Sequence, residues 1–189
     1  MPTLLDSYSE ANKDSSYQIA AVDANKALGQ CFTTPNDGIS YKITSVKFYL
    51  AKNGTITGNA TARLWAITGT YGTDAVPTGT VLATSDNFNV GAITGSFVLY
   101  ELTFSGVNQY TMSPNTQYEI DLTYGGGSVG NEIEFGADSS SPTHGGNLTS
   151  QDLVDVWAGY STIDGIFYVY GDNAAAAVSH NFGTLGVGS

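Results

Sequence analysis

Cysteine, basic side chains and long apolar runs are scarce in this chain of 189 residues. Its one cysteine, Cys31, excludes a disulfide within the chain, and its strand-like surroundings predict a small buried thiol. No segment reaches the ~20 apolar residues that a membrane-crossing helix requires. The first residues also lack the basic and apolar regions of a secretory signal. We therefore expect no membrane insertion and a fold that holds together without disulfides.

Acidic residues outnumber basic ones by 17 to 6, which gives a formal net charge of -11. Such a charge repels phosphate backbones at long range, so we expect no nucleic-acid partner. Charged residues nevertheless make up only 12% of the chain, and uncharged side chains together with glycine dominate its polar segments. Weakly charged polar surfaces of this kind are typical of extracellular, sugar-facing and capsid proteins.

The length of the chain fits one sandwich-sized domain, which buries about 70% of its unfolded surface and needs no metal to form a core. We therefore expect no cofactor. A structural calcium ion stays open as an alternative, although no Asp-x-Asp-x-Asp spacing is present. Its oxygen ligands would come from Asp6, Asp14, Asp138, Asp152 or Asp155.

Alternating apolar and polar side chains predict β-strands along most of the chain. In residues 43–50 and again in residues 117–124, every second side chain is apolar. A strand with this period of two has one face in the core and one in water. The polar face of residues 117–124 includes Glu119 and Asp121, which we therefore expect to be solvated.

Roughly eight or nine short strands with turn signals about every 8–12 residues predict an all-β fold, a two-sheet antiparallel β-sandwich of the jelly-roll type. We assign the sandwich to residues 28–171. Residues 1–27 are predicted to form an N-terminal arm and a first strand, and residues 172–189 an extended C-terminal arm. Within the sandwich, the segment 138–150 is rich in Ser, Thr, Gly and Asn and predicts a loop.

The C-terminal segment carries isolated hydrophobic residues between small and glycine residues. Two interpretations stay open for it. It is either a tail without fixed structure, or an assembly arm that orders by docking on a neighbouring subunit. The residues that would dock are Val178, Phe182, Leu185 and Val187.

Acidic residues on neighbouring strands are the only acid–base candidates. Glu119, Asp121, Glu132 and Glu134 are predicted on outward faces, where carboxylate pairs at the separation used by glycoside hydrolases are conceivable. Any acidic antiparallel pair produces such pairs, so we interpret them as a solvated face and expect no enzyme. His144 lies in a Pro-Thr-His-Gly-Gly segment and is interpreted as a hydrogen-bonding loop residue rather than a ligand.

Aromatic residues provide the candidates for ligand binding. Trp65 shares one face of its predicted strand with Arg63, so an indole and a guanidinium lie side by side. Exposed aromatic rings stack on sugars in jelly-roll carbohydrate modules. The carbohydrate-binding candidates are Trp157, Tyr160, Trp65 and Tyr71, and packing in the core or at its rim is the alternative for each.

Four segments carry a resemblance to a known module: residues 43–50, 58–66, 76–85 and 136–147. Together they resemble a β-sandwich module of phage virion proteins, meaning tail, fibre and capsid-decoration components, and of bacterial surface proteins. The resemblance spans roughly residues 28–171 and rests on structural motifs. It implies a sandwich fold and transfers no catalytic residue.

The resemblance implies a non-enzymatic virion structural protein of the capsid-decoration or head- or tail-fibre type. Such a protein would be assembled in the host cytoplasm, attach to other virion or capsid subunits through its arms, and form a homo-oligomer. The alternative is a carbohydrate-binding module for adhesion to surface glycans, located outside the cell or at its surface. Both functions are compatible, because a sandwich displayed on a particle can also bind host glycans.

Overall fold

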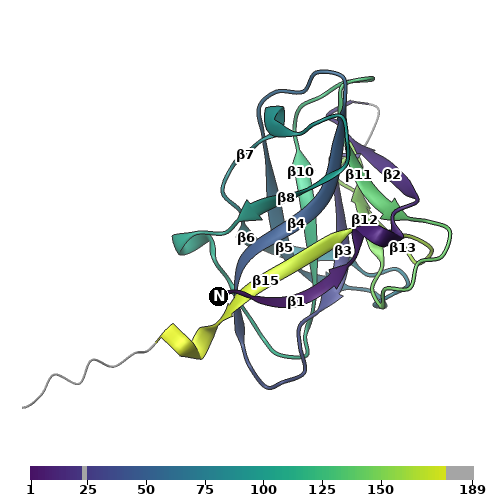
Figure 1. The fold of residues 1–189 in the computed structure, drawn as a ribbon. Coiled ribbons are helices and arrows are strands. Elements are labelled where there is room, and N and C mark those ends of the chain that lie inside the picture. The colour runs from purple at the N-terminus through teal and green to yellow at the C-terminus, as the bar shows by residue number, and fades with distance from the viewer. Residues whose placement is uncertain (23–24, 178–189) are drawn as a thin grey trace, which may run out of the picture.

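The protein is an all-β sandwich in which two antiparallel sheets pack against each other, as predicted (Figure 1). The computed structural model describes residues 1–22 and 25–177. Within these residues, helical structure is confined to short 3-10 turns, namely η1 (Glu10–Asn12), η2 (Val90–Ala92), η3 (Gly106–Asn108) and η4 (Ala174–Ala177). No helix in the described part of the chain has the length and apolar character needed to cross a membrane.

Each sheet combines long central strands with short edge strands. The first sheet has eight strands: β1 (Thr3–Tyr8), β15 (Phe167–Asn173), β4 (Tyr41–Asn53), β11 (Glu132–Asp138), β14 (Asp164–Gly165), β2 (Ser15–Ile19), β8 (Val98–Thr103) and β9 (Thr111–Met112). The second sheet has seven: β13 (Trp157–Tyr160), β12 (Leu148–Gln151), β3 (Ala27–Thr33), β10 (Gln117–Tyr124), β5 (Asn59–Thr68), β6 (Val76–Thr84) and β7 (Phe88–Asn89).

The strand order is that of a jelly roll, in which one antiparallel ribbon wraps around a core. β5 and β6 form the tip of the ribbon, and behind them β4 pairs with β8, β3 with β10, and β2 with β11. Successive pairs alternate between the sheets. The first sheet therefore contains the order β2-β11-β4-β8 and the second the order β3-β10-β5-β6. The pairs β1–β15 and β12–β13 extend this framework.

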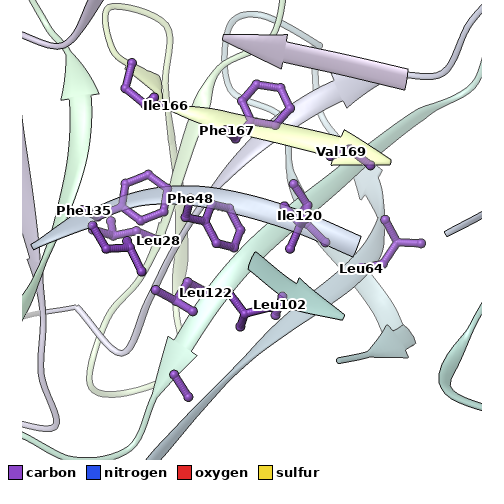
Figure 2. Packing of buried hydrophobic residues seen from close by; sticks show 14 of the residues in the cluster. Leu28, Phe48, Leu64, Leu102, Ile120, Leu122, Phe135, Ile166, Phe167 and Val169 are labelled. Atoms are coloured by element: carbon purple, nitrogen blue, oxygen red, sulfur yellow. The ribbon is translucent and has the colours of Figure 1, made fainter. Parts of the chain in front are cut away.

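The hydrophobic core lies between the two sheets and is rich in aromatic rings. Figure 2 shows Phe48 and Phe135 of the first sheet side by side, with Leu28 of the second sheet beside them. The two phenyl centroids are 5.3 Å apart, and all three side chains are buried. Burying one phenylalanine or leucine side chain contributes roughly 1.5–3 kcal/mol, so this layer accounts for much of the driving force for folding.

Residues 1–27, predicted to form an arm and a first strand, contribute two strands, β1 and β2, to the first sheet. β1 pairs with β15, and its Leu5 and Tyr8 are buried. β2 pairs with β11, with Ile19 fully buried opposite Ile133. The pattern of β1 is difficult to recognise because a bulge between residues 4 and 6 interrupts the period of two on which strand prediction relies.

At the C-terminal end, β15 extends to Asn173 and the turn η4 follows it. The predicted arm therefore begins with two residues that still pair with β4, since Asp172 lies opposite Lys42 and Asn173 opposite Tyr41. The proposed docking residues of the arm lie outside the described residues: Val178, Phe182, Leu185 and Val187.

Candidate functional site

The outward-facing carboxylates of β10 are fully buried. Glu119 and Asp121 alternate with the core residues of this strand and so point away from the first sheet, yet neither side chain is exposed to water. The prediction of a solvated acidic face is therefore wrong here. Something covers the outer face of the second sheet over these two residues.

The cover is the second sheet itself, which curls over its own outer face. β13 and β6 stand at opposite ends of a six-strand path, where a flat sheet would separate them by roughly 24 Å, yet they contact each other. The loop of residues 69–75 leads from β5 into β6 and lies against β13. A Cβ on Gly159 of β13 would lie 2.8 Å from the Ala75 oxygen, so a glycine is required at this crossing.

β12 is the strand that makes this curl possible, and it was expected to be part of a loop. The loop prediction for residues 138–150 is wrong in its last part, because Leu148–Gln151 pairs with β3. Thr149 and Gln151 face the covered side of the sheet and are buried. Strand prediction relies on apolar residues at every second position, and it therefore misses β12, because the residues on this side of the sheet are polar.

Arg63 of β5 compensates the charge of Asp121. Its Nε donates to both carboxylate oxygens, at 3.0 and 3.2 Å, and the Arg63 side chain is 18% exposed. Trp65 Nε1 donates to Asp121 Oδ2 at 2.8 Å. The same carboxylate therefore orients a guanidinium and an indole ring.

Arg63 also lies between two tryptophan rings. Its guanidinium carbon is 5.2 Å from the ring centroid of Trp65 and 5.8 Å from that of Trp157 on β13. The two indoles meet edge to face, with 6.1 Å between centroids. Arg63 Nη2 donates to Gln151 Oε1 at 3.1 Å. We call these four partly or largely buried side chains, Arg63, Trp65, Gln151 and Trp157, the tryptophan patch.

Glu119 lies beneath the tryptophan patch and, unlike Asp121, forms no ion pair within the described residues. Its Oε1 accepts a hydrogen bond of 2.6 Å from Thr149 Oγ1, and its Oε2 has no partner within the described residues. A Cβ at position 29 would lie 2.0 Å from Glu119 Oε1, so only glycine leaves room for the carboxyl group. Burial, reinforced by the nearby charge of Asp121, raises the pKa of Glu119 well above its usual value.

Burial raises the pKa of Asp121 to about 6, while the charge of Arg63 and the hydrogen bonds from Arg63 and Trp65 act to lower it. The ion pair with Arg63 thus offsets part of the cost of burying this carboxyl group, and burial disfavours the charged form of the neighbouring Glu119.

The structure brings together two of the four predicted carbohydrate-binding residues. Trp65 and Trp157 meet in the tryptophan patch, although they are far apart in sequence. Tyr71 packs against Gly145 in the loop that covers the second sheet, and burial raises its pKa to about 12. Tyr160 points to the other face of β13, because it pairs with the inward-facing Leu148. These two tyrosines do not join the patch.

Sequence reasoning missed one member of the patch, Gln151. The pairing of Arg63 with Trp65 follows from their i, i+2 spacing on one strand, and the structure confirms that they share a face. Gln151 comes from the strand that was expected to be a loop. The alternation of Thr149 and Gln151 before Trp157 was the available signal.

The remaining acidic candidates do not gather into one site. Glu132 and Glu134 belong to β11 of the first sheet, whereas Glu119 and Asp121 belong to the second. Among residues 1–22 and 25–177, no three acidic, histidine or cysteine side chains are arranged to hold a metal ion. Of the aspartates considered for calcium, Asp14 accepts hydrogen bonds from the backbone of Ser139 and Ser140. The other aspartates considered for calcium belong to no such group within the described residues: Asp6, Asp138, Asp152 and Asp155.

His144 is a hydrogen-bonded loop residue, as predicted. Its Nδ1 accepts from Gly146 N at 3.1 Å and lies 3.1 Å from the Gln30 amide nitrogen, while its Nε2 lies 3.3 Å from both oxygens of Asp6. This arrangement assigns the ring proton to Nε2. Cys31 is likewise buried and inert, since burial raises the pKa of its thiol far above the neutral range.

Fold and site together define a jelly-roll β-sandwich whose second sheet curls over a buried polar cluster and presents two tryptophans at its edge. Comparison with protein-family models finds no match for the chain, and a search of curated proteins finds none either.

Proposed function

We propose that this protein is a non-catalytic binding module that holds carbohydrate at the tryptophan patch. The observation that carries the proposal is the combination of two indoles with two side-chain donors that the described residues leave unused. Arg63 Nη1 and Gln151 Nε2 make no hydrogen bond within the described residues, and neither belongs to the fully buried atoms that lack a partner. Neither atom is completely sealed from solvent, so each can donate to a ligand at the rim of the patch.

Sugars match this chemistry on both counts. A pyranose offers an apolar C–H face that stacks on an indole, and hydroxyl oxygens at its rim that accept hydrogen bonds from planar donors. The bonds to Asp121 and Gln151 fix the rotamers of Trp65 and Arg63 before a ligand arrives, which reduces the entropy lost on binding. Arg63, the cation of the patch, is already paired with Asp121, so the site favours a neutral sugar over an anionic one.

The proposal is tested by screening the full chain on a glycan array and titrating each hit by calorimetry. Trp157→Ala removes one wall of the patch, and we expect it to weaken binding about tenfold or more. Phe97→Ala is the matched control, because Phe97 stacks on Tyr49 on the first sheet, away from the patch, with ring centroids 5.4 Å apart. Absence of saturable binding to any glycan, or equal affinity of Trp157→Ala and the parent, would overturn the proposal.

A second candidate function is that of a virion structural subunit, of the capsid-decoration or fibre type, which attaches through its C-terminal arm. Two observations support it. Among the described strands, β1 pairs only with β15, which leaves its other edge available for strand addition. Thr3 lies opposite Gly171, so β15 ends beside the start of β1. On this proposal the protein resides in the virion, and on the first it faces glycans at a surface.

Light scattering of the full chain and of a chain truncated after Ala177 tests the second candidate. This truncation preserves all of β15 and removes the predicted docking residues. An oligomer that becomes a monomer on truncation supports arm-mediated assembly. A monomer of the mass of one chain, ~20 kDa, in both samples removes homo-oligomeric assembly from consideration.

A further inference from the structure

A small pocket opens at the margin of the sandwich, separate from the tryptophan patch. It has a volume of about 100 Å³ and lies where β2 of the first sheet meets β12 and β13 of the second. Its lining residues are Tyr17, Asn25, Leu28, Leu148, Ser150, Tyr160 and Ile163. We call it the tyrosine pocket, because Tyr17 and Tyr160 approach it from opposite sheets.

The floor of the tyrosine pocket is apolar and rigid. Leu28 and Leu148 belong to the core and are 1% exposed, and Ile163 packs against that core. The backbone of Leu148 donates to the Ile163 oxygen at 3.0 Å, which fixes the two residues relative to each other. A methyl group placed on this floor would be removed from water without any change in the fold.

The walls supply one hydrogen-bond donor and one acceptor. Ser150 Oγ and Tyr160 Oη lie 3.2 Å apart and share one hydrogen bond, so one of their two hydroxyl protons stays free to donate. Asn25 donates its Nδ2 to the Gln18 oxygen at 3.3 Å, and its Oδ1 accepts no bond from the described residues. A ligand that fits must therefore accept from the hydroxyl pair and donate to Asn25.

We infer that the tyrosine pocket binds the acetamido group of an N-acetylated sugar. Its methyl group would contact the leucines, its carbonyl would accept from the Ser150–Tyr160 pair, and its N–H would donate to Asn25. The sugar ring would remain outside, against Tyr160, whose side chain is 40% exposed. The inference rests on the proposed function in one respect, namely that the molecule carrying the acetamido group is a sugar.

The tyrosine pocket lies close to the tryptophan patch along β13. Its volume of about 100 Å³ leaves room for an acetamido group. Trp157 and Tyr160 are three residues apart on β13, about 10 Å along the strand. One oligosaccharide can thus reach both the patch and the pocket around this edge strand.

The test is a nitrogen–proton correlation titration of the full chain with N-acetylglucosamine, glucose and N-acetylglycine. We expect the amide signals of Leu148, Ser150 and Ile163 to shift with N-acetylglucosamine and to stay in place with glucose. The indole N–H signals of Trp65 and Trp157 report separately on the tryptophan patch. Indole shifts without pocket shifts overturn this inference and leave the proposed function standing. No shift with either sugar overturns the inference, whatever the glycan array shows.

Two variants connect the shifts to the pocket. Ser150→Ala combined with Tyr160→Phe removes both hydroxyls and keeps the ring, and we expect it to weaken N-acetylglucosamine binding about tenfold. Tyr100→Phe, which removes a tyrosine hydroxyl bonded to Thr94 on the other sheet, should leave binding unchanged. The same spectra show whether each variant is folded. Equal affinity of a folded double variant and the parent, or equally strong pocket shifts with N-acetylglycine, would contradict the assignment to an N-acetylated sugar.

Discussion

The molecule has two interiors, and they are held together by different physical interactions. Between the sheets, Phe48 and Phe167 are buried among other apolar side chains, where contact is favourable in almost any orientation. Under the curl of the second sheet, Glu119 and Asp121 are equally buried but require specific partners. The first interior stabilises the fold through area, whereas the second depends on a few hydrogen bonds whose geometry must be right.

The polar interior is the one that positions ligand-facing side chains. Asp121 holds both Arg63 and Trp65, and Arg63 in turn contacts Trp157. An apolar replacement of such a cluster often preserves or increases stability, so stability alone does not explain its presence. We interpret the buried pair as the support of the tryptophan patch.

The largest expected effect is in the apolar interior. Phe167→Ala removes a ring that is 0% exposed and lies 6.3 Å from Phe32 between centroids, and we expect a loss of about 3–5 kcal/mol in the free energy of unfolding. Urea denaturation followed by tryptophan fluorescence measures it. A loss below about 1 kcal/mol would mean that the core relaxes around the cavity. It would contradict the claim that buried area in the apolar interior stabilises the fold.

Next comes the charge pair of the polar interior. Arg63→Met keeps the length of the stem and leaves Asp121 buried without a cation, for an expected loss of about 3 kcal/mol by the same denaturation assay. Adding Asp121→Asn should recover part of that loss, because no buried charge then remains. The control is Lys26→Met. Lys26 forms an exposed ion pair with Asp155, and its removal should change stability by less than about 1 kcal/mol.

The last prediction concerns the dependence of stability on pH. The raised pKa means that folded Glu119 keeps its proton above pH 4.5, where the unfolded chain releases it. The free energy of unfolding should therefore fall as pH rises above that value, by about 1.4 kcal/mol per unit, until the folded pKa is reached. Glu119→Gln removes this contribution, so its stability relative to the parent should increase from pH 4.5 to 7.5. Parallel pH profiles for the two proteins would show that Glu119 is not protonated in the fold.

The sandwich could be predicted from sequence because its central strands obey the period of two. β10, and β4 from Val46 to Leu50, place apolar residues on one side, and burial of that side follows from the hydrophobic effect alone. β12 was missed because its outward residues Thr149 and Gln151 are polar and nevertheless buried. The first strand predicted within residues 1–27 could not be placed at β1, because a bulge shifts the pattern of β1 by one residue.

The candidate site was only half predictable, for a related reason. Residues two apart on one strand share a face, so Arg63 and Trp65 could be paired from sequence. The approach of Trp157 depends on the curl of the whole second sheet and on the crossing at Gly159. The solvation of Glu119 depends on the same curl, which a local pattern does not encode. Long-range closure of a sheet is a tertiary property.

The pairing of Thr3 with Gly171 has a kinetic consequence. Among the described strands, β1 pairs only with β15, so the first of these strands to be synthesised must wait for the last, and the closing loop is almost as long as the described chain. Topologies with such high contact order fold in milliseconds to seconds rather than microseconds. During synthesis, the edge of β4 that β15 covers therefore stays open until the ribosome has released residue 173, and this edge is where premature association between nascent chains would begin.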